Sequence, residues 1–297
     1  MSRSIPILQV DAFTARPFGG NPAGVVPDAD GLSDDDMRRI AGEMNIAETG
    51  FVSQPTGPGA DFRLRWFTPT GHEISFCGHA TVGTAHALAE AGRVRGDRIV
   101  FDTLGGPLPV TVERGDGRAV IWLEPRLPSC TPHGGPLPDV LAALGATTAG
   151  DWAQPALTSD RDLLVPMPAL AALQRLAPDM GAIARTAAAG SLRGICAVAL
   201  GGIDPGSRTH CRFFAPHVGI PEDLVTGSVH AAIPVWLREA GVLPIEGEVA
   251  RFTAEQGDFL GRPGRLRLEL HLERGQLARV RVGGEAVTTL IGTLRLD

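Results

Sequence analysis

Residues 65–80 read RWFTPTGHEISFCGHA, and residues 212–229 read RFFAPHVGIPEDLVTGSV. Each stretch contains a strand-like run that ends at a proline, then an acidic loop, then a glycine that opens an alanine-rich helix. Those glycines are Gly78 and Gly227, and the second loop is two residues longer than the first. Because one unit occurs twice, the sequence predicts two similar half-domains related by a pseudo-two-fold axis.

The remaining patterns predict several strands and a capped helix. Residues 7–13, 49–53 and 62–67 are strand-like, and Ser33 with Asp36 resembles a capping box at the start of a helix ending near Asn45. In residues 265–272, leucines alternate with charged or polar residues, which is typical of a strand with one solvated face. Such one-sided sheets are usually antiparallel, so we expect antiparallel strands here.

Proline and glycine mark the expected boundary between the halves. Residues 125–138 contain five prolines and two glycines, a composition that should neither propagate a helix nor sit inside a sheet. We therefore expect an N-terminal half over residues 1–125 and a C-terminal half over residues 126–285. An alternative to this boundary is that the last strand, near residues 286–297, returns to the first half.

Composition excludes several classes of partner. The formal net charge is -6 and the pI is near 5.8, so no basic surface for nucleic acid is expected. No apolar run approaches 18 residues, which excludes a membrane helix. The four cysteines show neither a C-x-x-C motif nor a zinc spacing, as expected of reduced thiols in a cytoplasmic protein. A homodimer is expected from the frequency of such assemblies.

The two helix starts are candidate binding sites for a carboxylate. A helix N-terminus carries unpaired N–H donors and a partial positive charge, and glycine lets a ligand approach the backbone. The N–H groups around Gly78, Gly227 and Ser228 are therefore predicted to hold a small acid without any arginine. Tight turns are the alternative explanation for either glycine alone.

Candidate proton-transfer residues lie near both repeats. His79 is in the first turn of its helix, where the dipole is expected to lower its pKa and keep the ring neutral. Glu48 begins an apolar strand, and Glu222 and Asp223 precede Gly227; a carboxylate beside buried strands is expected to have a raised pKa and to act as a general base. Caps or solvated loops are the ordinary alternative. Since no H-E-x-x-H motif is present, no metal is expected.

These residues together resemble a known family. The resemblance rests on motifs that follow one another along nearly the whole chain: Asp11-Ala12-Phe13-Thr14, Pro17-Phe18-Gly19-Gly20-Asn21-Pro22-Ala23, Ala47-Glu48-Thr49, Arg65-Trp66-Phe67-Thr68-Pro69, Cys77-Gly78-His79-Ala80-Thr81, Glu222-Asp223-Leu224-Val225-Thr226-Gly227-Ser228, Glu255-Gln256-Gly257 and Gly261-Arg262-Pro263. The chain is similar to the phenazine-biosynthesis isomerase (PhzF-like) family. The resemblance implies the diaminopimelate-epimerase-like fold of the α+β class, in which each half is a curved, mostly antiparallel sheet around a central helix. It also implies an active site between the halves, with no cofactor and no metal.

The resemblance assigns roles to individual residues. Glu48 matches the glutamate that takes a proton from carbon and helps redeliver it, and His79 and Asp223 match its partners in catalysis. Gly78, Gly227 and Ser228 match the substrate-binding positions. Leu224 and Val229 depart from the residues usual in the family, proline and alanine, so the identity of the small carboxylic acid substrate is left open.

Two alternatives remain from the sequence. Cys77 stands directly before Gly78, as one thiol of a two-cysteine epimerase or racemase would, but its repeat counterpart is Thr226, so the second thiol base is missing. A dehydratase that relies on Cys77 alone is a variant of this alternative. A non-catalytic protein that binds small acids is the other, although it would not need Glu48, His79 and Asp223 together.

Overall fold

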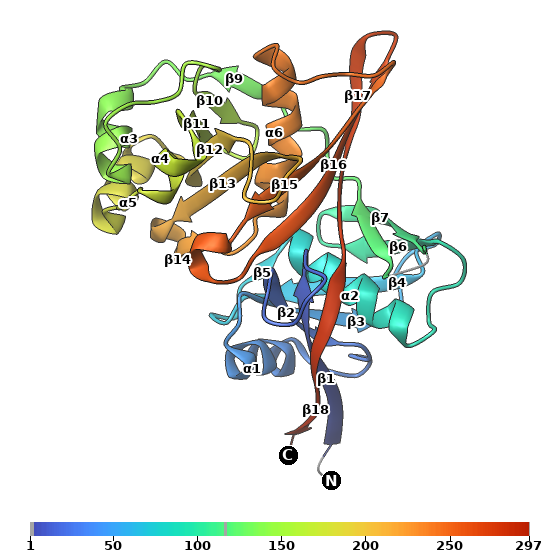
Figure 1. The fold of residues 1–297 in the computed structure, drawn as a ribbon. Helices are drawn as coiled ribbons and strands as arrows, with labels where there is room; N and C mark the ends of the chain where they lie inside the picture. Colours follow the sequence, from blue (N-terminus) through green and yellow to red (C-terminus); the bar gives the residue numbers. More distant parts are fainter. Residues whose placement is uncertain (1–2, 116–117, 297) are drawn as a thin grey trace. The chain divides into compact units, whose positions relative to one another are not determined.

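The computed structural model describes residues 3–115 and 118–296, and it divides the chain into two compact units (Figure 1). Unit 1 runs to Glu124 and also takes the chain from Gly283 onward, whereas unit 2 comprises Pro125–Val282. The final strand therefore belongs to unit 1, together with the N-terminal strands.

Unit 1 is a mostly antiparallel sheet with two helices. Its strands are β1 (Arg3–Ala12), β2 (Asn21–Val26), β3 (Glu48–Ser53), β4 (Phe62–Phe67), β5 (Glu73–Ile74), β6 (Arg98–Thr103), β7 (Gly106–Glu113), β8 (Val120–Leu123) and β18 (Ala286–Leu296), and its helices are α1 (Asp34–Met44) and α2 (Gly78–Glu90). β1 pairs antiparallel with β18 and β2, and β3 with β4. β2–β3 and β4–β6 are parallel. Antiparallel pairs complete the sheet from β6 to β8.

Helix α2 is the central helix of unit 1. It contacts strands β1, β2, β3, β7, β8 and β18, and its residues from Gly78 to Leu88 are all buried (Figure 1). Small residues allow this close packing: a Cβ added at Gly83 would lie 3.4 Å from the side chains of Val10 and Ala23. The predicted central helix and the α+β class are thus confirmed for this unit.

Unit 2 repeats the same kinds of strand pairing. Its elements are β9 (Cys130–Pro132), α3 (Leu137–Leu144), β10 (Ala156–Thr158), β11 (Asp162–Pro166), α4 (Leu170–Gln174), α5 (Met180–Ala189), β12 (Gly194–Leu200), β13 (Ser207–Ala215), η1 (Pro216–Val218), β14 (Ile220–Asp223), α6 (Gly227–Glu239), β15 (Val249–Gln256), η2 (Asp258–Leu260), β16 (Gly264–Glu273) and β17 (Gln276–Gly284). β11–β12 and β13–β15 are parallel, as β2–β3 and β4–β6 are in unit 1. β10–β11, β12–β13, β13–β14 and β15–β16 are antiparallel. Helix α6 contacts β9 and β16 and is buried from Val229 to Leu237.

The arginine that opens each repeat plays the same part in both units. Nε of Arg65 on β4 donates to Glu73 on β5 over 2.8 Å, and Nε of Arg212 on β13 donates to Glu222 on β14 over 2.7 Å. Each guanidinium also lies over a phenylalanine ring two residues along its own strand, at 5.0 and 5.1 Å. Glu222 is therefore an ion-pair partner that fixes the strand carrying Asp223.

Two local predictions are confirmed. Ser33 and Asp36 form the capping box of α1, and Asn45 ends that helix with a left-handed φ of 48°. The alternating leucines lie in β16 with Leu266, Leu268 and Leu270 buried, although Glu269 on the expected solvated face is buried as well.

The proline-rich segment departs from expectation. Residues 125–138 were expected to lie outside the sheets, yet Cys130–Pro132 form strand β9, paired only with β10 among the described strands of unit 2. Proline is tolerated there because an edge strand leaves one row of N–H positions unpaired. Helix α3 also begins inside the segment, with Pro138 in its first turn, where the missing N–H removes no helical hydrogen bond.

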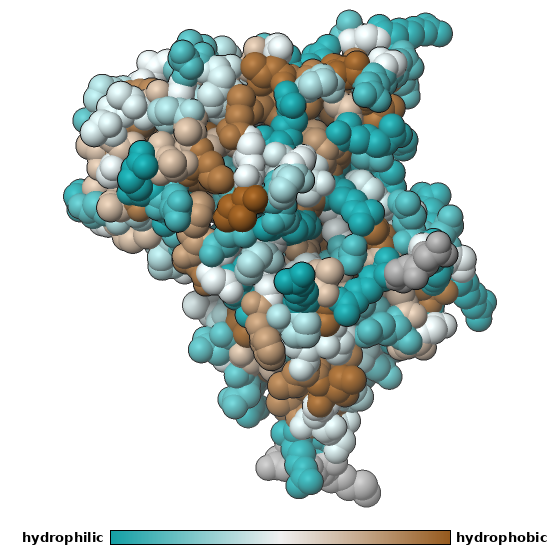
Figure 2. All heavy atoms as spheres, in the orientation of Figure 1, coloured by the Kyte–Doolittle hydropathy of each residue, from teal (hydrophilic) through white to brown (hydrophobic). Residues whose placement is uncertain are grey.

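Among residues 3–115 and 118–296, no helix combines the length and apolarity needed to cross a bilayer. Figure 2 shows hydrophilic and apolar side chains interspersed over the face drawn. Leu290 and Ile291 on β18 are exposed apolar residues.

The Arg212–Glu222 pair is predicted to stabilise unit 2. Arg212→Met should lower the free energy of unfolding by about 3 kcal/mol, because it leaves the nearly buried Glu222 carboxylate without its partner and removes donors to the Leu173 and Leu176 carbonyls. Urea denaturation measures the loss. The same substitution at the exposed Arg39 should change stability by less than about 0.5 kcal/mol. Equal effects of the two variants would contradict a structural role for the pair.

Candidate active site

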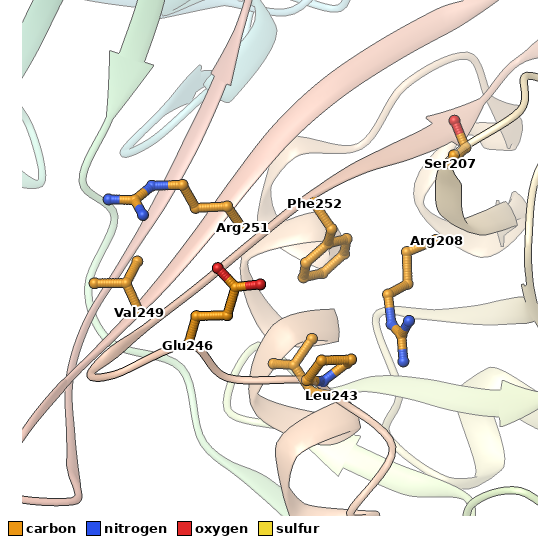
Figure 3. Close-up of a pocket in the computed structure, with 9 residues that line it drawn as sticks. Ser207, Arg208, Leu243, Glu246, Val249, Arg251 and Phe252 are labelled. Atoms are coloured by element: carbon orange, nitrogen blue, oxygen red, sulfur yellow. The ribbon is translucent and has the colours of Figure 1, made fainter.

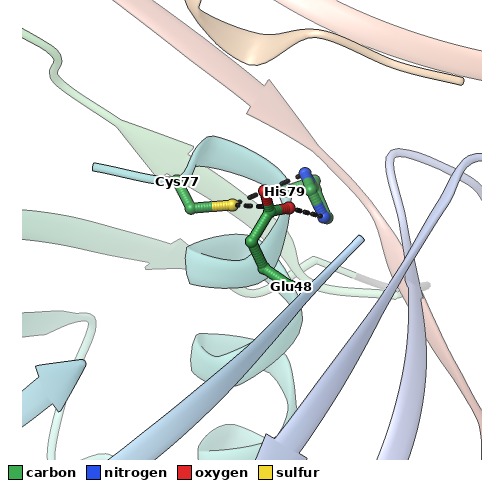
Figure 4. Close-up of side chains that lie close together, drawn as sticks. All are labelled: Glu48, Cys77 and His79. Carbon is green, nitrogen blue, oxygen red and sulfur yellow. Dashed lines mark hydrogen bonds and ion pairs between the residues drawn. The ribbon is translucent and has the colours of Figure 1, made fainter. Parts of the chain in front are cut away.

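Three chemically active side chains converge in unit 1 (Figure 4). Nε2 of His79 lies 3.1 Å from Oε2 of Glu48, and Sγ of Cys77 lies 3.5 Å from the same oxygen. The Cys77 sulfur is also 3.6 Å from Nδ1 of His79. The side chains of Glu48 and His79 are only 12% and 9% exposed, so the group is a nearly buried cluster of titratable side chains.

Local structure brings these residues together. Glu48 is the first residue of β3, and it shares a strand face with Gly50, where an added Cβ would lie 2.7 Å from the Thr84 hydroxyl of α2. The strand can therefore approach the helix closely. Cys77 is the extended residue that precedes α2, and His79 stands in its first turn. Close packing of β3 on α2 thus places Glu48 against the helix start.

The electrostatics of Glu48 contradict the expected raised pKa. Burial of the carboxylate opposes ionisation, but the contact with His79 and the hydrogen bond from Cys77 outweigh it and lower the pKa of Glu48. Glu48 is consequently ionised at neutral pH. The Glu48 carboxylate can therefore accept a proton without first having to lose one.

The expected neutral His79 is also wrong. Burial alone would lower its pKa, but the contacts with Cys77 and with the Glu48 carboxylate raise the pKa of His79 well above 6.5. The sequence showed that His79 lies at a helix start, but it did not show the contact with the Glu48 carboxylate. This direct ionic partner outweighs the helix dipole. Nε2 has no aligned hydrogen bond despite its 3.1 Å distance to Glu48, so the contact is an ion pair with poor hydrogen-bond geometry.

Cys77 is held as a thiol. Burial and the neighbouring Glu48 charge raise its pKa to about 11, so little thiolate forms at neutral pH. A thiol can donate a hydrogen bond to Glu48 but is a poor base. This state disfavours a mechanism in which Cys77 removes the proton.

Within the described part of the chain, two groups of side chains have the composition of metal ligands. Glu48, Cys77 and His79 offer donor atoms within 4.8 Å of one another, as do His210, Glu255 and Asp258 in unit 2. In the second group Glu255 accepts from the Ile203 and Asp204 N–H groups. The ionised Glu48 and charged His79 already neutralise each other, which weakens the case for a metal in the first group.

The remaining predicted residues gather in unit 2. The Thr226 hydroxyl donates to Asp223 over 2.6 Å, and the Gln256 amide donates to the Asp223 carbonyl over 2.9 Å. Gly227 and Ser228 form the first turn of α6, and neither is fully buried. Asp223, Gly227 and Ser228 therefore lie at one helix start, and Glu48, Gly78 and His79 at the other. That both groups face one cleft stays a prediction.

Two residues near the start of α6, Gln256 and Arg193, had no assigned role in the sequence prediction. The Gln256 side chain bonds both the backbone and the hydroxyl of Thr226. Its Oε1 accepts from the Thr226 N–H over 3.0 Å, and its Nε2 donates to the hydroxyl oxygen over 3.1 Å. Gln256 lies in the quoted motif Glu255-Gln256-Gly257, which was a usable signal. Arg193 donates to Ser228 over 2.8 Å, and nothing in the sequence links these residues, which are 35 positions apart.

A separate cavity of about 460 Å³ lies in unit 2 (Figure 3). Glu246 and Arg251 lie on one side of it and Arg208 on the other, with Phe252 between them. None of the predicted site residues lines this cavity, so it is distinct from the two helix starts where those residues lie.

The charge state of His79 is a direct test of this site. The ring should remain protonated above pH 6.5 in imidazole NMR titration, because Glu48 stabilises the cation. Its charged form stabilises the fold fully below 6.5, and this contribution is lost as the pH rises through the raised pKa. Glu48→Gln should lower the titration midpoint, whereas Glu43→Gln, at an exposed position of α1, should leave it unchanged. A wild-type midpoint at or below 6.5 would refute the ion pair.

Comparison with known proteins places the chain in a family. The model of the phenazine biosynthesis-like protein family (PhzC-PhzF) matches residues 10–292. An uncharacterized isomerase from Pseudomonas aeruginosa is 37% identical over 298 residues, covering 98% of this chain and 99% of the relative. Trans-2,3-dihydro-3-hydroxyanthranilate isomerase from Pseudomonas chlororaphis is 33% identical over 288 residues, covering 97% and 98%. The crystal structure of the Bacillus anthracis phenazine biosynthesis protein of the PhzF family has a TM-score of 0.87 at 26% identity, covering 98% and 99%. The chain therefore belongs to the phenazine biosynthesis-like protein family.

Proposed function

We propose that this protein is a cofactor-independent isomerase that moves a proton on a small carboxylic acid by general acid/base catalysis. The nearly buried pair of Glu48 and His79 carries this proposal, because it supplies an ionised carboxylate beside a cation in a site largely shielded from water. The isomerases named among its full-length relatives support the reaction class.

The proposed reaction needs only one proton carrier. The Glu48 carboxylate takes a proton as a C–H bond of the substrate breaks, and the electron pair moves along the conjugated system. A new C–H bond forms at another carbon when Glu48 returns the proton, so atoms and charge balance without a redox step. The His79 cation stabilises the negative charge that develops between the two steps. The Cys77 thiol donates to Glu48 and keeps its carboxylate oriented.

The substrate carboxylate is proposed to bind at the helix starts. The backbone at Gly78 and Gly227 and the hydroxyl of Ser228 supply donors, and Asp223 takes part in proton handling or substrate placement. Trans-2,3-dihydro-3-hydroxyanthranilate, named for the Pseudomonas chlororaphis relative, is the first substrate to try. The matching strand pairings of the two units support their origin by duplication.

The expected cellular context follows from the same proposal. We propose a cytoplasmic homodimer with a small-molecule substrate and without a nucleic-acid or membrane partner. All four cysteines are free and buried, which agrees with a reducing compartment.

The alternatives are less well supported by the side chains. A thiol-dependent epimerase, racemase or dehydratase needs a reactive Cys77, whereas this thiol has a pKa of about 11. The position before α6, which a second thiol would take, is occupied by Thr226 bonded to Asp223. A protein that only bound acids would not need an ionised glutamate against a buried histidine cation.

Glu48→Gln tests the proposed base. The amide keeps the size of the side chain but cannot accept the carbon proton, so kcat with trans-2,3-dihydro-3-hydroxyanthranilate should fall at least about a hundredfold. KM should change little, because the carboxylate-binding groups remain. Glu43→Gln is the matched control and should keep wild-type kinetics. A Glu48→Gln enzyme with near wild-type kcat would show that another residue is the base.

Cys77→Ser distinguishes acid/base catalysis by Glu48 from thiol or metal chemistry. We expect the variant to keep kcat within about tenfold of the wild type, since serine can still donate to Glu48. Neither enzyme should lose activity after exhaustive treatment with a chelator. Cys130→Ser, which removes a buried thiol outside the cluster, controls for packing effects. A loss as large as that of Glu48→Gln would support a catalytic or metal-ligating Cys77.

A further inference from the structure

The two units differ at one equivalent position of their sheets. In unit 1, Glu48 begins β3 and pairs with Ala23 of the parallel strand β2. In unit 2, Gly194 begins β12 and pairs with Asp162 of the parallel strand β11. Because the neighbouring strand pairings match, Gly194 occupies the position of Glu48, and Arg193 is the residue just before it.

Unit 2 has no room for a second base at this position. A Cβ added at Gly194 would lie 2.3 Å from the ring of Phe213, so the phenyl ring fills the space that a side chain would need. The guanidinium of Arg193 lies over the same ring, 5.5 Å from its centroid. Glu48 provides an acid at this position in unit 1, whereas the equivalent position in unit 2, Gly194, is bordered by the Arg193 cation.

Arg193 connects a buried carboxylate to the first turn of α6. Its Nε donates to Oδ1 of Asp162 over 2.8 Å, and its Nη2 also bonds the second oxygen. Nη2 donates in addition to Oγ of Ser228 over 2.8 Å. The Asp162 side chain is 1% exposed and that of Arg193 is 38% exposed, so a partly exposed arginine is anchored on a buried carboxylate.

This contact determines what the Ser228 hydroxyl can do. A hydroxyl has one hydrogen to donate, and an arginine can only donate. When Arg193 bonds the Ser228 oxygen, the serine must act as the acceptor in that contact, and its hydrogen is left for another acceptor. The nearby positive charge also strengthens any hydrogen bond that this hydroxyl donates to an anion.

We propose that Arg193 is a positioning residue, which with Asp162 sets Ser228 as a hydrogen-bond donor to the substrate carboxylate. This inference rests on the proposed function and assigns different tasks to the halves: unit 1 handles the proton, and unit 2 recognises the anion. It also revises the expectation that the carboxylate is held without any arginine, since Arg193 acts on it through Ser228.

Lysine cannot reproduce this arrangement. The guanidinium is a planar fork that bonds both Asp162 oxygens while Nη2 reaches Ser228, whereas an ammonium group is a single point on a flexible chain. Arg193→Lys therefore keeps the charge opposite buried Asp162 and disturbs the contact with Ser228. It is a suitable first variant because it leaves no buried carboxylate without a cation.

The test is a double-mutant cycle on ligand affinity. The probe is 3-hydroxyanthranilate, a stable aromatic acid related to the proposed substrate, and titration calorimetry gives its Kd. Arg193→Lys and Ser228→Ala should each weaken binding about tenfold. The double variant should bind about as well as either single variant, because the arginine acts only through the serine. Binding of 2-aminophenol, which lacks the carboxylate, should not change among these proteins.

Two further measurements separate positioning from a general structural effect. Arg161→Lys, at a neighbouring arginine that bonds the Gly190 and Ser191 carbonyls, should leave the Kd unchanged. With trans-2,3-dihydro-3-hydroxyanthranilate, Arg193→Lys should raise KM about tenfold while kcat stays within about twofold of wild type. If Arg193→Lys fails to fold, Asp162→Asn with Arg193→Met removes both charges together and should give the same loss of affinity.

The outcomes distinguish this inference from the proposed function. Unchanged affinity in Arg193→Lys, or losses that multiply to about a hundredfold in the double variant, would overturn the role of Arg193 while the isomerase proposal stands. A wild-type protein that neither binds 3-hydroxyanthranilate nor turns over the dihydro acid would overturn the proposed carboxylate site for this substrate class and the inference built on it.

Discussion

The buried packing of one helix in each unit is the constraint on which the other features depend. Helices α2 and α6 are enclosed by strands, and small residues such as Gly50 and Gly83 let sheet and helix come close in unit 1. A buried helix must still leave its first N–H groups unbonded within the helix. The fold thus creates two polar helix starts beside apolar strands, and the reactive side chains lie at these places.

The two helix starts carry different chemistry although their strand pairings match. In unit 1 the ion pair between Glu48 and His79 overcomes the cost of burial and holds both groups charged. In unit 2 the ring of Phe213 fills the space of a corresponding acid, and Arg193 bonds Ser228 instead. This difference at equivalent backbone positions is the basis for proposing that one half transfers the proton and the other recognises the anion.

Much of the fold could be predicted from the sequence because its signals are local. The repeated motif showed both central helices, and Ser33, Asp36 and Asn45 marked the ends of α1. The pKa values of Glu48 and His79 could not be predicted, since they depend on a contact between residues far apart in the chain. The same holds for Arg193, and for Glu269, which is buried on the expected solvated face of β16 because Arg251 and Arg281 bind it.

Hydrogen exchange with solvent tests the central claim most directly, because a proton carried by Glu48 can exchange between its removal from carbon and its return. The wild-type enzyme is incubated in deuterated water with trans-2,3-dihydro-3-hydroxyanthranilate, and NMR locates deuterium in product and recovered substrate. The account predicts deuterium at the carbon that receives the proton, and no enzyme-dependent label with Glu48→Gln. Equal labelling by Glu48→Gln and wild type would contradict it.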